Sequence, residues 1–184
     1  MAKTTYYTAT SVDGFIADPD NSLDWLLGIE SRSDRFTPFF ARVGAFAMGA
    51  TTYEWVLAQE GLLEQPGKWP EWYGDRPCWV FTHRDLPAIP GADITFVRGD
   101  VRPVHASMAA AAGDGVVWLV GGGELVGLFA DQGLLDEVVL GVAPVFLGRG
   151  APVLPRRLTS DALELTDVER AGPFAYLTYA VRHR

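Results

Sequence analysis

The sequence predicts an α/β fold with a mostly parallel central sheet, because short apolar runs bounded by turn residues alternate with stretches of helical periodicity. The chain has 184 residues, of which 48% are hydrophobic and 12% aromatic. That is enough apolar surface for one core between a sheet and helices on both of its faces. Neither an internal repeat nor a linker interrupts the pattern, so we expect residues 1–184 to form a single domain.

The apolar runs predict strands at residues 5–10, 45–48, 78–81, 94–97, 116–120 and 137–142. The first helix is predicted over residues 34–43, where Phe36, Phe39, Phe40 and Val43 recur at the spacing of one helical face. Further helices are predicted over residues 52–59 and over the alanine-rich residues 104–112.

The last predicted helix begins on the glycines at residue 123 and ends at Gly133, a residue type that commonly terminates helices. At the C-terminal end, residues 162–169 and 174–182 flank a Gly-Pro turn. They predict an antiparallel hairpin added to the edge of the sheet. Aromatic side chains on this hairpin offer a surface for a homodimer.

Charge and composition exclude several classes of function. A net charge of −8 opposes a nucleic-acid partner, since such partners are held mainly by Lys and Arg. The single cysteine and three scattered histidines lack the spacing of a metal site, and no G-x-S-x-G hydrolase motif occurs. Neither a signal core nor a membrane-length apolar stretch is present. We therefore expect a cytoplasmic protein with a small-molecule substrate, no metal and no membrane partner.

The strongest local signal lies where the strand 116–120 runs into three glycines and a helix. These residues are Gly121, Gly122, Gly123, Glu124 and Leu125. Glycines allow a ligand to approach the backbone closely, and a helix N-terminus presents free N–H groups to a phosphate. The spacing matches neither the dinucleotide fingerprint nor the P-loop. The alternative is a glycine-rich turn that tight packing requires.

Two other strand ends carry polar residues. Gly49, Thr51 and Thr52 follow one strand, and the threonines can either cap the next helix or bind phosphate. Thr82 and Arg84 follow another strand, where Arg84 is either a solvated loop residue or the partner of a 2′-phosphate. Ligands of open α/β sheets lie at the carboxyl ends of strands, so these ends predict a dinucleotide groove.

The first strand ends at Asp13 and Gly14, a pair typical of turns. Asp13 is therefore either a turn residue or a catalytic carboxylate directed at substrate, with Gly14 beside it. Trp25 follows in a predicted loop, where it either covers a flat substrate ring or packs as an ordinary amphipathic side chain.

Four segments in order resemble the dihydrofolate reductase superfamily: residues 9–17, 48–54, 120–125 and 136–150. They resemble most closely the C-terminal reductase domain of bacterial bifunctional riboflavin-biosynthesis deaminase-reductases and its stand-alone relatives. The resemblance implies a dihydrofolate-reductase-like fold, NADPH as hydride donor and often a homodimer. It implies phosphate contacts from the residues 121–125 and from Gly49, Thr51 and Thr52, with the 2′-phosphate near Thr82 and Arg84.

Two positions bear on what the resemblance implies. The family commonly has Arg where this chain has Ala50, so one phosphate contact is lost. Folate reduction calls for an acid on the first helix, and Asp34 is the only acid there. An Asp at a helix start is also a common cap, so Asp34 has either role.

We therefore expect hydride transfer from NADPH to a pteridine-like or ribosylamino-pyrimidine-like substrate. Such an enzyme resembles 5-amino-6-(5-phosphoribosylamino)uracil reductase or dihydrofolate reductase. The alternative is a module that binds a nucleotide, flavin or folate without turnover.

Overall fold

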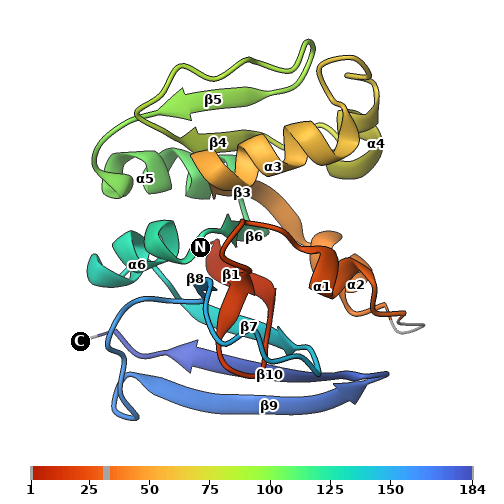
Figure 1. Ribbon diagram of the computed structural model, residues 1–184. Coiled ribbons are helices and arrows are strands. Elements are labelled where there is room, and N and C mark those ends of the chain that lie inside the picture. The colour runs from red at the N-terminus through yellow and green to blue at the C-terminus, as the bar shows by residue number, and fades with distance from the viewer. Residues whose placement is uncertain (1, 31–33, 184) are drawn as a thin grey trace.

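In the computed structural model, which describes residues 2–30 and 34–183, eight strands form one sheet in the order β5-β4-β3-β6-β1-β7-β10-β9. The bounds of these strands are β1 Lys3–Thr10, β3 Val43–Gly49, β4 Cys78–Phe81, β5 Ile94–Val97, β6 Val116–Gly121, β7 Glu137–Val142, β9 Leu163–Ala171 and β10 Phe174–Val181. The strands from β5 to β7 are mutually parallel, and β10 lies antiparallel between β7 and β9. Figure 1 shows this order from top to bottom. The predicted fold class and C-terminal hairpin are confirmed.

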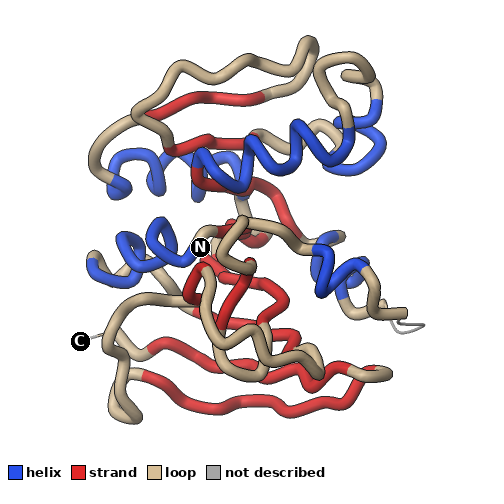
Figure 2. Tube along the Cα trace, viewed as in Figure 1, coloured by secondary structure: helices blue, strands red, loops and turns tan. Residues whose placement is uncertain are grey.

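Helices pack against both faces of the sheet (Figure 2). Their bounds are α1 Asp24–Leu27, α2 Phe36–Phe40, α3 Ala50–Glu60, α4 Lys68–Tyr73, α5 Val101–Ala112 and α6 Gly123–Asp131. On one face, Met108 of α5 and Phe129 of α6 pack with Tyr6 and Leu119 of the sheet. No helix in the described part of the chain is long and apolar enough to cross a membrane.

On the opposite face, α3 and α4 cover a core rich in aromatic rings. The rings of Phe46 and Tyr73 are stacked with centroids 5.0 Å apart, and Trp69 lies 4.4 Å from Tyr73. Phe39 and Phe40 of α2 pack at the margin of the same cluster. This face carries the aromatic side chains that later form the wall of the cavity.

Two predictions about local structure are wrong. The helix predicted over residues 34–43 is the short α2, and Val43 instead starts β3, paired with Val116. The spacing of Phe36, Phe39 and Phe40 is helical, but buried strand pairing takes over at Val43, which is 4% exposed. Trp25, placed in a loop by the sequence, lies in the single turn of α1.

The sequence did not predict a small second sheet, which lies beside the glycine turn after β6. β2, Phe15–Ala17, pairs antiparallel with β8, Ala151–Pro152. The pairing joins the segment after β1 to the segment after β7. It brings residues 15–17 and 151–153 over the glycine turn that follows β6, because the α6 residue Gly123 lies directly against Pro152 and Val153.

Candidate active site

A cavity of about 560 Å³ opens at the carboxyl ends of β1, β3 and β6, three adjacent strands of the sheet. This volume suits a small organic ligand, and the place is the usual one for ligands of open α/β sheets. The residues that line it are Tyr7, Thr8, Ala9, Ile16, Ala17, Asn21, Leu23, Phe36, Gly49, Ala50, Thr51, Thr52, Trp55, Val56, Tyr73, Trp118, Val120, Gly121, Gly122, Gly123, Glu124, Leu125, Ala151 and Pro152. Two of the three predicted strand ends therefore meet here.

Two helix N-termini lie at this cavity. α3 begins after Gly49 and α6 after Gly122, and both glycines line the cavity. No described side chain caps either helix, so the first N–H groups have no side-chain partner. The N-terminus of a helix carries roughly half a positive charge, which favours an anion. The cavity therefore has an anion cradle built from backbone.

The three glycines of the turn differ in what surrounds them. A Cβ on Gly122 would meet its nearest atom, Ile16 Cδ1, at 3.8 Å, which is ordinary van der Waals contact, so a methyl group would fit there. Gly121 has a φ of +142°, which a side chain rarely tolerates. A Cβ on Gly123 would lie 2.4 Å from the Pro152 carbonyl oxygen. Tight packing thus explains Gly123 but does not explain Gly122.

Thr51 and Thr52 lie in the first turn of α3, and both line the cavity. The sequence left capping and ligation open for them. Since the N-cap is Gly49 and no side chain of the described residues caps this helix, the capping role is not used. Both hydroxyls therefore stay available to a ligand at the helix end.

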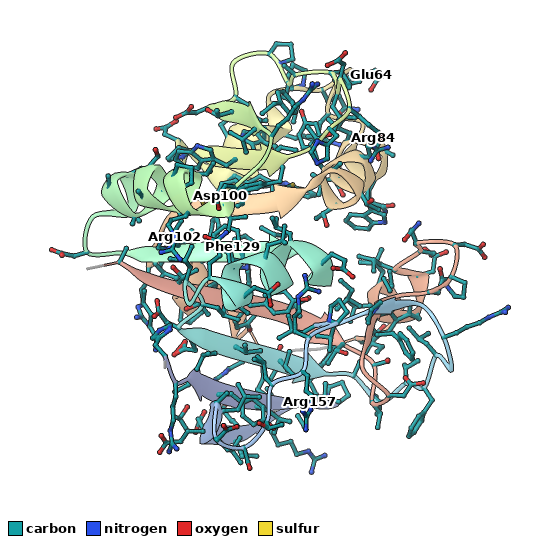
Figure 3. The ribbon with its side chains drawn as sticks, turned by 90° about the vertical axis from the view of Figure 1, so that its left-hand side faces the viewer. Glu64, Arg84, Asp100, Arg102, Phe129 and Arg157 are labelled. Carbon is teal, nitrogen blue, oxygen red and sulfur yellow. The ribbon has the colours of Figure 1, made fainter. Side chains whose placement is uncertain are left out.

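Thr82 and Arg84 do not line the cavity. The Thr82 hydroxyl accepts a hydrogen bond from the Arg84 backbone N–H at 2.9 Å, which holds the loop after β4. Arg84 makes a two-pronged ion pair with Glu54 of α3, with both N···O distances at 2.8 Å. Figure 3 shows Arg84 beside α3, in the upper half of the molecule.

Glu124 and Leu125 continue the first turn of α6. Leu125 is buried and joins the core while also lining the cavity. The Glu124 side chain is 77% exposed, and its carboxylate accepts a hydrogen bond from Arg156 at 3.0 Å. Arg156 lies over Gly127 and also pairs with Asp131 at 2.8 Å. Its guanidinium thus holds the Glu124 carboxylate along the outside of α6.

Asp13 connects two loops and does not line the cavity. Its carboxylate accepts hydrogen bonds from the Ser11 hydroxyl at 2.6 Å, the Leu147 N–H at 3.0 Å and the Gly148 N–H at 2.6 Å. These bonds, that from Ser11 first, hold the pKa of the Asp13 carboxyl below its usual value. Gly14, next to it, has a φ of +85° and its carbonyl accepts from the Val153 N–H.

Asp13→Asn is expected to lower the stability of the protein at neutral pH, because a neutral amide accepts the three hydrogen bonds less strongly. A lowered folded-state pKa contributes stability above the unfolded-state pKa of about 3.9, and this contribution is lost as the pH falls through the folded-state value. Urea unfolding at pH 7 and pH 3 should show the difference from wild type shrinking at pH 3. Asp20→Asn is the control, since no described residue donates to its carboxylate. An equal loss of stability in Asp13→Asn at both pH values would contradict a stabilising role of the ionised Asp13 carboxylate.

Asp34 and Trp25 also lie outside the cavity lining. The Asp34 carboxylate accepts a hydrogen bond from the Thr37 N–H at 2.9 Å, just before α2. Hydrogen bonds from the Thr37 side chain and backbone lower the pKa of this carboxyl, so it is ionised at neutral pH. The carboxylate thus binds an N–H in the first turn of α2 from one residue before the N-cap position, Arg35. Trp25 is partly buried in α1, and its neighbours Asn21 and Leu23 line the cavity instead. The catalytic and substrate-binding roles of Asp13, Asp34, Gly14 and Trp25 stay predictions.

Sequence reasoning missed the aromatic wall of the cavity. Tyr7, Phe36, Trp55, Tyr73 and Trp118 come from β1, α2, α3, α4 and β6. The Phe36 and Trp118 rings meet edge to face with centroids 5.2 Å apart. Two of these residues did leave a signal in the sequence. Side chains alternate between the two faces of a strand, so Tyr7 had to lie on the face of β1 opposite to that of Tyr6. Phe36 is the first of the aromatic residues at helical spacing in α2. No local motif could bring five separate elements together.

Comparison with known proteins places these observations in a family. The profile of the RibD C-terminal domain family matches residues 70–176. The uncharacterized protein YwjB of Bacillus subtilis (strain 168) is 31% identical over 178 residues, which cover 96% of this chain and 97% of YwjB.

Two solved structures are similar to the chain over nearly its whole length. A Shewanella sp. PV-4 protein named for riboflavin biosynthesis is 26% identical, with a TM-score of 0.79 over 100% of both chains. Dihydrofolate reductase from Enterococcus faecalis, solved with NADP(H), is 14% identical, with a TM-score of 0.60 over 98% of this chain and 97% of that one. The second likeness shows the fold, which is that of dihydrofolate reductase. The chain belongs to the RibD C-terminal domain family.

Proposed function

We propose that the protein is an NADPH-dependent reductase that binds the cofactor phosphates at the N-termini of α3 and α6. The observation that carries this proposal is the pair of uncapped helix ends, at Gly49 and Gly122, which open on one cavity. Backbone N–H groups and two helix dipoles suit a pyrophosphate, and Thr51 and Thr52 add hydroxyl donors. The residues present therefore fit a dinucleotide.

NADPH would supply the hydride, and the protein would supply orientation and a dry pocket. Gly121, Gly122 and the first turn of α6 would hold the pyrophosphate and the adjoining ribose. The remaining part of the cavity, toward β1 and α2, would hold the ring that is reduced. Glu124 is the only carboxyl group among the described lining residues, and Arg156 holds it outward. The proton that accompanies the hydride would then come from water.

A direct test is transfer of label from the reduced cofactor. NADPH carrying deuterium at the reactive carbon is incubated with the protein and a panel of flat reducible compounds. We expect deuterium in a reduced product. The amount of labelled product should equal the amount of NADPH consumed, which is followed by the loss of absorbance at 340 nm. Binding of NADPH without any label transfer across the panel would favour the alternative of a module that binds without turnover.

Arg84 and Glu54 give a prediction about cofactor preference. Arg84 would have to break its ion pair with Glu54 to bind a 2′-phosphate. Arg84 should therefore strengthen NADPH binding, whereas Glu54 should weaken it. Glu54→Gln removes the competing carboxylate and is expected to tighten NADPH binding several-fold, while Arg84→Ala weakens it by roughly tenfold. Dissociation constants for NADPH and NADH are measured in parallel. Equal effects on both cofactors would show that Arg84 does not contact the 2′-phosphate.

A further inference from the structure

The cavity has two chemically different halves. The half at Gly49 and Gly122 presents uncapped helix ends, as described above. The other half is a wall of ring faces. The rings of Tyr7 and Phe36 lie 5.7 Å apart, and Phe36 contacts Trp118, while Trp55 and Tyr73 complete the wall. A flat ligand would be surrounded here by aromatic and aliphatic carbon.

Polar groups are few on this wall. The Tyr7 hydroxyl is buried, and the Tyr7 ring stacks on Phe39 with centroids 4.6 Å apart while Tyr7 itself lines the cavity. Trp118 donates its indole N–H to the Tyr7 carbonyl at 3.1 Å, so this polar group is already paired inside the protein. The wall therefore recognises shape and ring surface more than hydrogen-bonding groups.

The cavity also lacks cations. None of the described residues that line it is Lys, Arg or His, and Glu124 is the only charged one. Two arginines outside the lining, Arg35 and Arg76, have other partners. Arg35 pairs with Asp167 and Glu169, and Arg76 donates to the Val43 carbonyl while stacking on Phe40 at 4.2 Å. An enclosed phosphate ester needs Arg, Lys or backbone donors to offset its desolvation.

We infer that the substrate is an uncharged, flat, reducible ring compound without a phosphate group. This inference rests on the proposed function, since the helix ends that could hold a substrate phosphate are assigned there to the cofactor. The inferred substrate therefore differs from a ribosylamino-pyrimidine phosphate, which carries a phosphate group. The reaction balances as NADPH, one proton and the oxidised ring giving NADP⁺ and the ring with two added hydrogens across a C=N, C=C or C=O bond.

The test compares matched ligands that differ by one phosphate. The probes are 5-amino-6-(5-phosphoribosylamino)uracil, its dephosphorylated nucleoside, and a set of neutral pteridines and quinones. Binding to the NADP⁺-saturated protein is measured by calorimetry, and NADPH oxidation is followed in parallel samples that contain NADPH in place of NADP⁺. We expect the nucleoside or a neutral ring to bind at least tenfold more tightly than the phosphate ester. We expect inorganic phosphate not to compete with it.

A matched pair of variants locates the binding site. Trp55→Ala removes a ring from the wall and is expected to weaken neutral-ring binding about tenfold, a larger loss than that of NADP⁺ affinity. Trp72→Ala is the control, since Trp72 is 46% exposed on α4 and does not line the cavity. Tighter binding of the phosphate ester, or no binding of any neutral ring at millimolar concentration, would overturn the inference. Failure of NADP⁺ to bind would instead overturn the proposed function.

Discussion

Replacing Gly123 with alanine is expected to lower the free energy of unfolding by about 1–3 kcal/mol, the usual cost of adding a methyl group to a packed site. The new Cβ would lie 2.4 Å from the Pro152 carbonyl oxygen, 2.6 Å from that of Val153 and 2.9 Å from the Val153 carbonyl carbon. All three are backbone atoms, so no side-chain rotation relieves the clash. Either α6 or the β8 segment must move, and the N-terminus of α6 would no longer face the cavity correctly.

Two further glycine variants separate this packing effect from an effect on binding. Gly67→Ala places its Cβ where no heavy atom lies within 4 Å, and it should leave stability and cofactor binding unchanged. Gly122→Ala meets only Ile16 Cδ1 at 3.8 Å, so the protein should fold while NADPH binding weakens tenfold or more. Urea unfolding and cofactor titration measure both quantities. A Gly123→Ala protein as stable as wild type would contradict this packing.

The second large effect is expected at Ala50, the first residue of α3 and part of the cavity lining. The resemblance described in the sequence analysis implies Arg at this position. Ala50→Arg should restore a charge-assisted contact to the cofactor phosphates worth about 1.5–3 kcal/mol, a gain of roughly 10- to 100-fold in NADPH affinity. A cation at a helix N-terminus opposes the dipole, so a loss of about 0.3–1 kcal/mol in stability should accompany the gain.

The control for this variant is Ala50→Gln, which extends the side chain without adding charge. It should bind NADPH no better than wild type, since only the charged contact is restored. Affinities are measured by titration at low and high salt, and the gain from arginine should shrink as salt rises. Unchanged or weaker NADPH binding in Ala50→Arg would mean that the cofactor phosphates do not lie at the start of α3.

Much of the fold could be predicted because its strands are continuous apolar runs. The strands Cys78–Phe81, Ile94–Val97 and Glu137–Val142 have the bounds that the sequence predicted, since each is a short apolar run between turn residues. β2 and β8 could not be predicted, because two or three residues become strands only through pairing between segments that are far apart in the chain. Val43 was misplaced because helical spacing continued across a boundary that strand pairing decides.

In the candidate site, too, some residues could be interpreted from the sequence and others could not. Its glycine turn could be found because a helix that starts on glycine is a local signal, and Gly49 and Gly122 indeed meet at one cavity. Asp13 and Asp34 were harder to interpret, since a carboxylate in a turn looks the same whether it faces a substrate or a backbone N–H. Only the structure shows that Leu147, Gly148 and Thr37 donate to them.

The most direct test of the central claim is an NADPH titration followed by tryptophan fluorescence. Trp55 and Trp118 line the cavity, so a nicotinamide bound there should quench their emission. We expect saturable quenching with a micromolar dissociation constant in the wild-type protein, weakened at least tenfold in Gly122→Ala. No quenching and no thermal shift at millimolar NADPH would contradict NADPH binding in this cavity.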